Sequence, residues 1–218
     1  MKRLLLLEGG VRGAQGDSAR ALALLGAHAA ASFHLDTLGL TEFTGTVEQL
    51  VARAQAADAL AVGTGTYWGS WGSPLQRFFE VMTPHEMTPV FLGKPAAAVV
   101  TMDSVGGADV GMRLLGVLGL FGCAVPPAAL VVLSRVGLQA KARRDRDGDR
   151  DGDRDRDVWG EDDLRTVADN LARAAEAHTA YVGWDVEPGR ALAGRYPHSG
   201  PLELGFGRVL PTRPDQSA

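Results

Sequence analysis

Short apolar runs alternate with longer helical segments along this chain, and the alternation limits the fold more than any other feature. The runs end at glycine or polar residues, as expected for strands that are buried on both faces. The intervening segments have the three- to four-residue apolar spacing that is typical of helices. The predicted strands cover residues 4–7, 32–35, 59–62, 96–100 and 129–133, and the predicted helices cover 19–30, 47–57, 74–82, 110–121 and 161–182.

Five strand-then-helix units predict an α/β fold, a three-layer open parallel five-stranded sheet with helices on both faces. Local signals place the helix starts. Asp17 and Ser18 are candidate N-caps of the first helix, and Thr46 of the second. Pro74 suits the first turn of the third helix.

Composition excludes several function classes. With 218 residues and 45% hydrophobic residues, the chain can bury one sizeable core. The net charge of −4 argues against a nucleic-acid surface. The single cysteine, Cys123, lies in an apolar run, so we predict a buried structural thiol and no intrachain disulfide. We find no signal peptide and no apolar stretch long enough to span a membrane, and we predict a cytoplasmic protein.

Two segments fall outside the alternating pattern. Residues 141–157 hold seven aspartates, six arginines and one lysine, and we predict a solvated insertion between the fifth strand and the last helix. Within it, Asp147, Asp149 and Asp151 match the opening of a calcium loop, but Val158 stands where the loop needs a glutamate, so we predict no metal site. The second segment, residues 184–218, has no clear helical or strand periodicity. We therefore divide the chain into a domain over 1–183 and an irregular tail over 184–218.

The fold places a ligand at one edge of the sheet. In open parallel sheets ligands bind beyond the carboxyl ends of the strands, where the strand order reverses. For the order 2-1-3-4-5 this crevice lies between strands 1 and 3. Three polar, glycine-rich loops follow strands 1, 3 and 4, namely EGGVRGAQGDSAR, GTGTYWGSWGS and TMDSVGGADVG. Their convergence predicts a binding site at this edge.

The loops differ in chemistry. The first leads into a helix N-terminus, which favours an anion, and Arg12 and Ser18 can add contacts to a phosphate. The second joins flexible glycines to the aromatic rings of Tyr67 and Trp68, which suit a planar heterocycle. An alternative interpretation makes Trp68 and Trp71 anchors at a subunit interface.

The run ADALAVGTGTYWGSWGSPLQRFFE resembles the segment AD-x-x-x-x-x-T-P-x-Y-x-G-S-x-x-x-x-L-K-x-F-x-D of the NAD(P)H-dependent FMN reductases, which have a flavodoxin-like fold. FLGKPAAAVVTMDSVGG is similar to the family's L-x-G-K-P strand and the loop after it, and LFGCAVPPAALVV resembles the approach to the fifth strand. The chain departs from the family at Gly65, where a proline is usual, and in its longer first loop, GGVRGAQGDS.

The resemblance implies an FMN held by the three loops. Phosphate contacts would come from Arg12, Ser18 and Ala19; Thr66, Tyr67, Trp68, Gly69 and Ser70 would line the ring; Ser104, Gly106 and Gly107 would close its other side. It also implies an oxidoreductase that takes electrons from NADPH or NADH and passes them to a quinone, flavin, azo compound or metal ion, without catalytic side chains, and that forms a homodimer or homotetramer. The alternatives are a flavodoxin-type electron carrier and a flavodoxin-like interaction module without cofactor.

Overall fold

A computed structural model of the chain describes residues 1–147, 159–177 and 179–183. Its centre is a five-stranded sheet in the order β2-β1-β3-β4-β5. All four strand pairs are parallel. The predicted fold class and strand order are therefore confirmed. The strands are β1 Lys2–Glu8, β2 Phe33–Gly39, β3 Ala59–Gly65, β4 Ala96–Met102 and β5 Leu130–Ser134.

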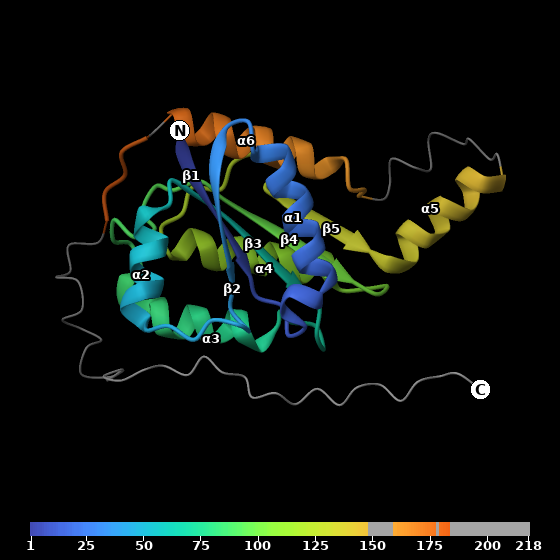
Figure 1. The fold of residues 1–218 in the computed structure, drawn as a ribbon, viewed down its shortest axis with the longest axis horizontal. Coiled ribbons are helices and arrows are strands. Elements are labelled where there is room, and N and C mark those ends of the chain that lie inside the picture. The colour runs from blue at the N-terminus through green and yellow to red at the C-terminus, as the bar shows by residue number, and fades with distance from the viewer. Residues whose placement is uncertain (148–158, 178, 184–218) are drawn as a thin grey trace.

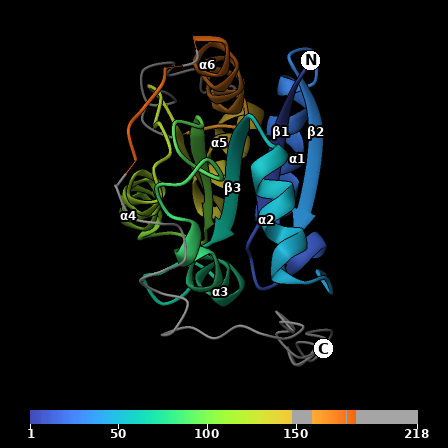
Figure 2. The same ribbon diagram turned by 90° about the vertical axis from the view of Figure 1, so that its left-hand side faces the viewer.

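Helices cover both faces of the sheet. The helices α1 and α6 lie side by side on one face (Figure 1), and α4 lies on the opposite side from α1 (Figure 2). The α-helices are α1 Asp17–Ala29, α2 Val47–Ala56, α3 Ser73–Met82, α4 Gly107–Leu120, α5 Arg135–Asp147 and α6 Asp163–Ala177, and the short 3-10 helices are η1 Gly13–Gln15 and η2 Thr83–His85.

The sheet separates two hydrophobic clusters. One cluster joins alternate residues of the strands to α2, α3 and α4, and contains the aromatic side chains of Phe78, Phe79, Phe91 and Phe121. The other joins the remaining strand positions to α1 and α6. Strands such as β3, whose first six residues are all buried, are apolar on both faces because helices cover both. Cys123 is buried in the first cluster, as predicted.

Helix starts follow the predicted signals at two of three places. Thr46 and Gln49 form a reciprocal capping box at the start of α2, and Pro74 lies in the first turn of α3. The prediction for α1 is wrong, because Gly16 is the N-cap and Asp17 and Ser18 lie inside the first turn. The hydroxyl of Ser18 donates to the buried carboxylate of Glu8.

The end of the chain differs from the prediction in two ways. Residues 141–147, which we expected in a solvated insertion, complete α5, a helix that projects from the end of β5 (Figure 1). Alanine, lysine and arginine are good helix formers even without an apolar face. Residues 148–157 and the tail 184–218 lie outside the described residues. The last helix ends at Ala177 rather than at 182, and Tyr181 packs near Gly93 instead of continuing it.

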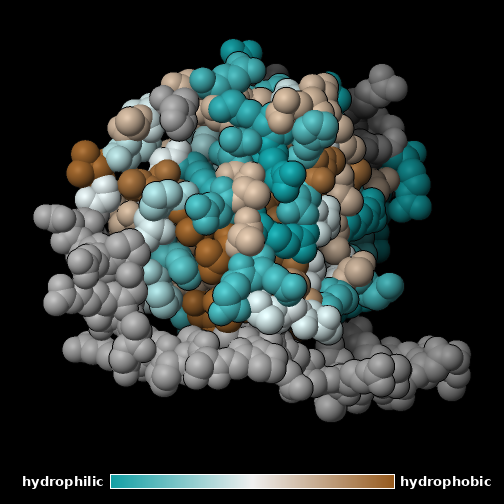
Figure 3. Space-filling view, turned by 60° about the vertical axis from the view of Figure 1, so that its left-hand side comes forward, coloured by the Kyte–Doolittle hydropathy of each residue, from teal (hydrophilic) through white to brown (hydrophobic). Residues whose placement is uncertain are grey.

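Figure 3 shows one face on which hydrophilic residues surround smaller hydrophobic areas. Within the described part of the chain, no helix combines the length and the hydropathy that crossing a membrane requires.

Candidate functional site

Hydrogen bonds fasten the loops at the carboxyl edge of the sheet to one another. The N–H of Gly9 donates to the carbonyl of Gly63 at 2.8 Å, which joins the loop after β1 to β3. The N–H of Thr66 donates to the carbonyl of Thr101, also at 2.8 Å, which joins the loop after β3 to β4. The predicted convergence of the loops is therefore a bonded arrangement.

A cavity of about 730 Å³ lies at this edge, next to the ends of β3, β4 and β5. One wall comes from the first loop and α1, and another from α5. Its lining combines charged and polar side chains with apolar ones. The lining residues are Arg12, Asp17, Arg20, Ala21, Gly65, Thr66, Tyr67, Thr101, Met102, Asp103, Leu133, Arg135, Leu138, Gln139, Ala142 and Glu161.

Charges at the rim of the cavity are paired. Arg20 and Glu161 form an ion pair at 2.9 Å between α1 and the segment before α6. Arg135 and Asp103 form another, also at 2.9 Å, between α5 and the loop after β4. Exposed pairs of this kind contribute little stability, about 0–1 kcal/mol each. They set the charge at the rim close to neutral.

The first loop wraps around a buried carboxylate. Glu8, the last residue of β1, is only 3% exposed. Its Oε1 accepts hydrogen bonds from the N–H of Gly10 and the hydroxyl of Ser18, each at 2.8 Å. Its Oε2 is buried and has no hydrogen-bond partner among the described residues. The carboxylate therefore already accepts from one donor of the first loop and one donor of the first turn of α1.

The environment of Glu8 disfavours its charge. Burial raises the pKa of Glu8 to about 7, and the nearby Glu42 adds to this rise. The hydrogen bonds from Ser18 and Gly10 oppose it only in part. Near neutral pH the carboxyl group is thus divided between its protonated and ionised forms.

The second loop turns sharply at its tip. Tyr67 and Ser70 exchange two backbone hydrogen bonds of 2.7 and 2.9 Å, with Trp68 and Gly69 between them. Both central residues have positive φ, 48° for Trp68 and 75° for Gly69, as in a type I′ turn. Trp68 is fully exposed at the tip, whereas Tyr67 is half-buried and lines the cavity. Burial raises the pKa of Tyr67, and the backbone of Val11 and the charge of Arg12, both in the first loop, lower it in part.

The same loop is anchored to α4 within the chain. Trp71 packs edge-on against Phe79 at 6.1 Å, and its ring N–H donates to Gln76. The guanidinium of Arg113, on α4, lies 5.5 Å from the centre of the Trp71 ring and donates to the carbonyl of Gly69. These contacts give Trp71 a role inside the chain, beside the interface role that the sequence left open.

The third loop faces the second across the site. Gly106 begins α4 with a φ of 85°, and a Cβ at this position would be 3.8 Å from the methyl group of Thr66. The hydroxyl of Thr66 is buried and has no partner among the described residues. Gly107 packs so tightly that a Cβ would come within 2.4 Å of Val132. The glycines therefore let α4 start close to β5 and to the second loop.

The predicted site residues fall into two groups. Arg12, Thr66 and Tyr67 line the cavity, and Ser18 and Ala19 lie in the first turn of α1 beside it. The remaining predicted residues lie on the surrounding loops without lining the cavity; they are Trp68, Gly69, Ser70, Ser104, Gly106 and Gly107. The structure thus brings the three loops together but puts only part of each against the cavity.

Sequence reasoning missed Glu8, Asp103 and Arg135. Glu8 carries a signal, because a carboxylate ends an otherwise apolar strand, LLLLE, directly before two glycines. No pattern in the sequence indicates the ion pair between Asp103 and Arg135, because their pairing depends on where α5 leaves the sheet.

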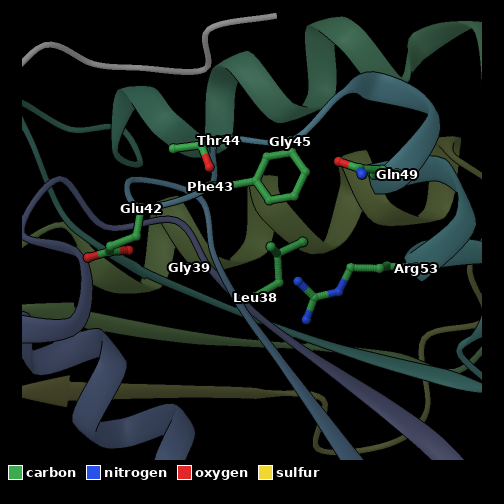
Figure 4. Close-up of a pocket in the computed structure, with 8 residues that line it drawn as sticks. All are labelled: Leu38, Gly39, Glu42, Phe43, Thr44, Gly45, Gln49 and Arg53. Atoms are coloured by element: carbon green, nitrogen blue, oxygen red, sulfur yellow. The ribbon is translucent and has the colours of Figure 1, made fainter. Parts of the chain in front are cut away.

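A second hollow, of about 390 Å³, is lined by residues from the end of β2, from the segment that follows it and from α2 (Figure 4). Three of its polar side chains bond within the chain. Glu42 accepts from the N–H of Ala14, Gln49 accepts from the N–H of Thr46, and Arg53 pairs with Asp36. We therefore assign this hollow a supporting role for the loops.

Comparison with known proteins agrees with this architecture. The model of the NADPH-dependent FMN reductase family matches residues 18–137. No curated protein sequence matches the chain.

Solved structures share the fold at low identity. RosB, solved with a bound flavin intermediate, superposes with a TM-score of 0.63 at 15% identity over 100% of this chain and 94% of its own. An oxidoreductase from Corynebacterium diphtheriae gives 0.63 at 16%, over 82% and 99%. The NAD(P)H:(acceptor) oxidoreductase FerB from Paracoccus denitrificans gives 0.55 at 17%, over 82% and 99%. At these identities the likeness establishes a common fold.

Proposed function

The chain belongs to the NADPH-dependent FMN reductase family, and from this premise we propose that it takes electrons from NADPH or NADH and passes them to a small acceptor. As a member of that family it is an FMN-dependent oxidoreductase. The proposal concerns its donor and its acceptor, which we place among quinones, free flavins, azo compounds and metal ions. We also propose a cytoplasmic homodimer or homotetramer.

The observation that best supports a flavin in this cavity, on which the proposed activity depends, is the buried hydroxyl of Thr66, which has no partner among the described residues and lies at the wall of the 730 Å³ cavity. A buried hydroxyl without a partner is costly unless a ligand satisfies it. The cavity is large enough for a flavin-sized ligand. Tyr67 offers an aromatic surface beside it, and Arg12 offers a cation next to the start of α1.

Bound FMN would supply hydride and electron transfer, so the protein has to bind, orient and shield rather than act as an acid or nucleophile. Arg12 and the first turn of α1 would hold the phosphate, and Thr66 and Tyr67 would hold the ring. Trp68, fully exposed on its turn, would cover the outer side of the ring or contact a second subunit.

The first test is reconstitution of the purified protein with FMN, followed by anaerobic addition of NADPH or NADH. Bleaching of the flavin absorbance is the expected result. A flavin that binds but is not bleached by either nucleotide would indicate an electron carrier instead. Failure to bind FMN at all would favour an interaction module and overturn the proposal.

A variant pair tests the site itself. Thr66→Val removes the unpartnered hydroxyl and should weaken FMN binding by roughly fivefold to tenfold, since one hydrogen bond contributes about 1 kcal/mol. Thr44→Val, an exposed residue in the second hollow, makes the same chemical change away from the cavity and should leave binding unchanged. Equal affinities for the two variants would show that Thr66 does not contact the cofactor.

A further inference from the structure

Glu8 places a carboxylate where the first loop would receive a phosphate. It ends β1, and it lies so close to the loop that a Cβ on Gly10 would come within 2.6 Å of its Oε1. That oxygen accepts from the N–H of Gly10, in the first loop, and from the hydroxyl of Ser18, in the first turn of α1. A buried anion already occupies these donors before any ligand arrives.

The second carboxylate oxygen of Glu8 also favours a protonated carboxyl group. The Oε2 of Glu8 is buried without a partner among the described residues, and a Cβ on Gly63 would lie 3.2 Å from it. An ionised carboxylate with one oxygen unsatisfied in the protein interior is unfavourable, whereas a protonated one loses much less. The geometry alone therefore favours a proton on this group.

We propose that Glu8 is a proton-linked gate for the phosphate end of the cofactor: the first loop accepts the phosphate when Glu8 is protonated, so FMN binding takes up a proton. This inference rests on the proposed function, because it assumes that FMN is the ligand. It makes Glu8 a positioning residue, which acts through the Ser18 hydroxyl and the Gly10 N–H.

The charges around the loop set the direction of the effect. Glu42, in the segment before α2, and Asp17, on α1, add negative charge; Arg12 is the nearby cation, and Tyr67 is neutral at these pH values. A phosphate dianion beside Glu8 would disfavour the ionised carboxylate further. By linkage, a ligand that raises the pKa of a group binds more weakly as the pH rises above that group's pKa in the free protein.

The free carboxyl group titrates at a pH that an experiment can reach, because burial raises the pKa of Glu8 to about 7. Between pH 6.5 and 8.5 we expect the dissociation constant of FMN to rise by roughly tenfold or more. The second pKa of the FMN phosphate is about 6, and its ionisation strengthens binding as the pH rises or leaves binding unchanged over this range. A loss of affinity with rising pH must therefore come from a group of the protein.

The experiment is a fluorescence titration of the full chain with FMN and with riboflavin, which lacks the phosphate, from pH 6.5 to 8.5. FMN should bind more weakly as the pH rises, and riboflavin should change by less than about twofold because it brings no anion to the loop. Glu8→Gln, which keeps the shape of the protonated acid, should bind FMN with a flat pH profile. Glu42→Gln is the matched control and should keep the slope.

Calorimetry gives a second readout that does not depend on any variant folding. Titration of the unaltered chain with FMN at pH 7.5, in two buffers of different ionisation enthalpy, should show net proton uptake. A flat FMN profile without proton uptake would overturn the gate while leaving the proposed function standing. An equal slope for riboflavin, or for Glu8→Gln, would overturn it by assigning the titration to another group. Failure of both flavins to bind at any pH would overturn the proposed function and the gate with it.

Discussion

Gly72 offers the sharpest test of how the site's loops are held together. It lies near the end of the second loop, directly before α3, and its N–H donates to the hydroxyl of Thr64 at 2.9 Å. A Cβ at this position would lie 2.6 Å from the carbonyl oxygen of Gly9 and 3.3 Å from the nitrogen of Val11. Both are backbone atoms, so no side chain can rotate away to make room.

Gly72→Ala must therefore push the first loop and the second loop apart. Overpacking of this kind costs about 1–3 kcal/mol, and the reduced entropy of the unfolded chain returns about 0.4–1 kcal/mol. We expect a net loss of roughly 1–2 kcal/mol and a fall in the melting temperature of about 2–4 °C for each kcal/mol. Because the first loop moves, FMN affinity should fall as well.

The control is Gly116→Ala, in the middle of α4, where a Cβ meets nothing within 4 Å. Alanine is the better helix former, so this variant should be more stable by about 0.5–1 kcal/mol. Urea unfolding of both variants without cofactor measures the two effects. If Gly72→Ala unfolds with the same free energy as the parent chain, the first and second loops are not in close contact at Gly72 in solution.

Three further predictions concern single residues. Burial raises the pKa of Glu8 from 4.5 to about 7 in the folded chain, so the folded chain binds more protons than the unfolded chain between these pH values, and this residue's contribution to stability is lost as the pH rises through 7. In urea unfolding without cofactor at pH 8, Glu8→Gln should be more stable than the parent chain by roughly 2–4 kcal/mol, and its stability should lack this dependence on pH. Equal pH slopes for the variant and the parent would contradict the assignment. Trp68→Asn should raise the free energy of unfolding by up to about 1 kcal/mol, because asparagine tolerates the positive φ that Trp68 adopts. An unchanged melting temperature would contradict backbone strain at this turn. Burial raises the pKa of Cys123 to about 12, so a disulfide reagent should modify the thiol only after unfolding, and rapid reaction of the folded chain would show that the thiol is accessible.

The sequence predicted the layers of this fold because the strands other than the edge strand β2 are mainly apolar runs. In a parallel sheet covered on both faces, that pattern follows directly from burial, and β3 and β4 begin at the predicted residues, 59 and 96. The convergence of the loops was predictable too, because a loop that follows a parallel strand leaves the sheet at its carboxyl edge and the strand order decides which loops are neighbours.

What the sequence could not show was how polar groups pair inside the site. The hydroxyl of Ser18 suits a cap or a phosphate equally well, and only the fold reveals that Glu8 takes it. Helix α5 was missed because its second half, residues 141–147, is mostly charged, although its residues favour a helix. The wall that α5 gives the cavity, through Arg135 and Leu138, was therefore missed with it.

The attachment of Arg113 to the second loop has a consequence for how the site meets a ligand. This arginine pairs with Asp109 on its own helix at 3.1 Å and reaches across to Gly69 and Trp71. Since α4 also carries the third loop at its start, the second and third loops are fastened to the same helix. Little ordering of these two loops therefore remains to be done when a ligand enters the cavity beside them.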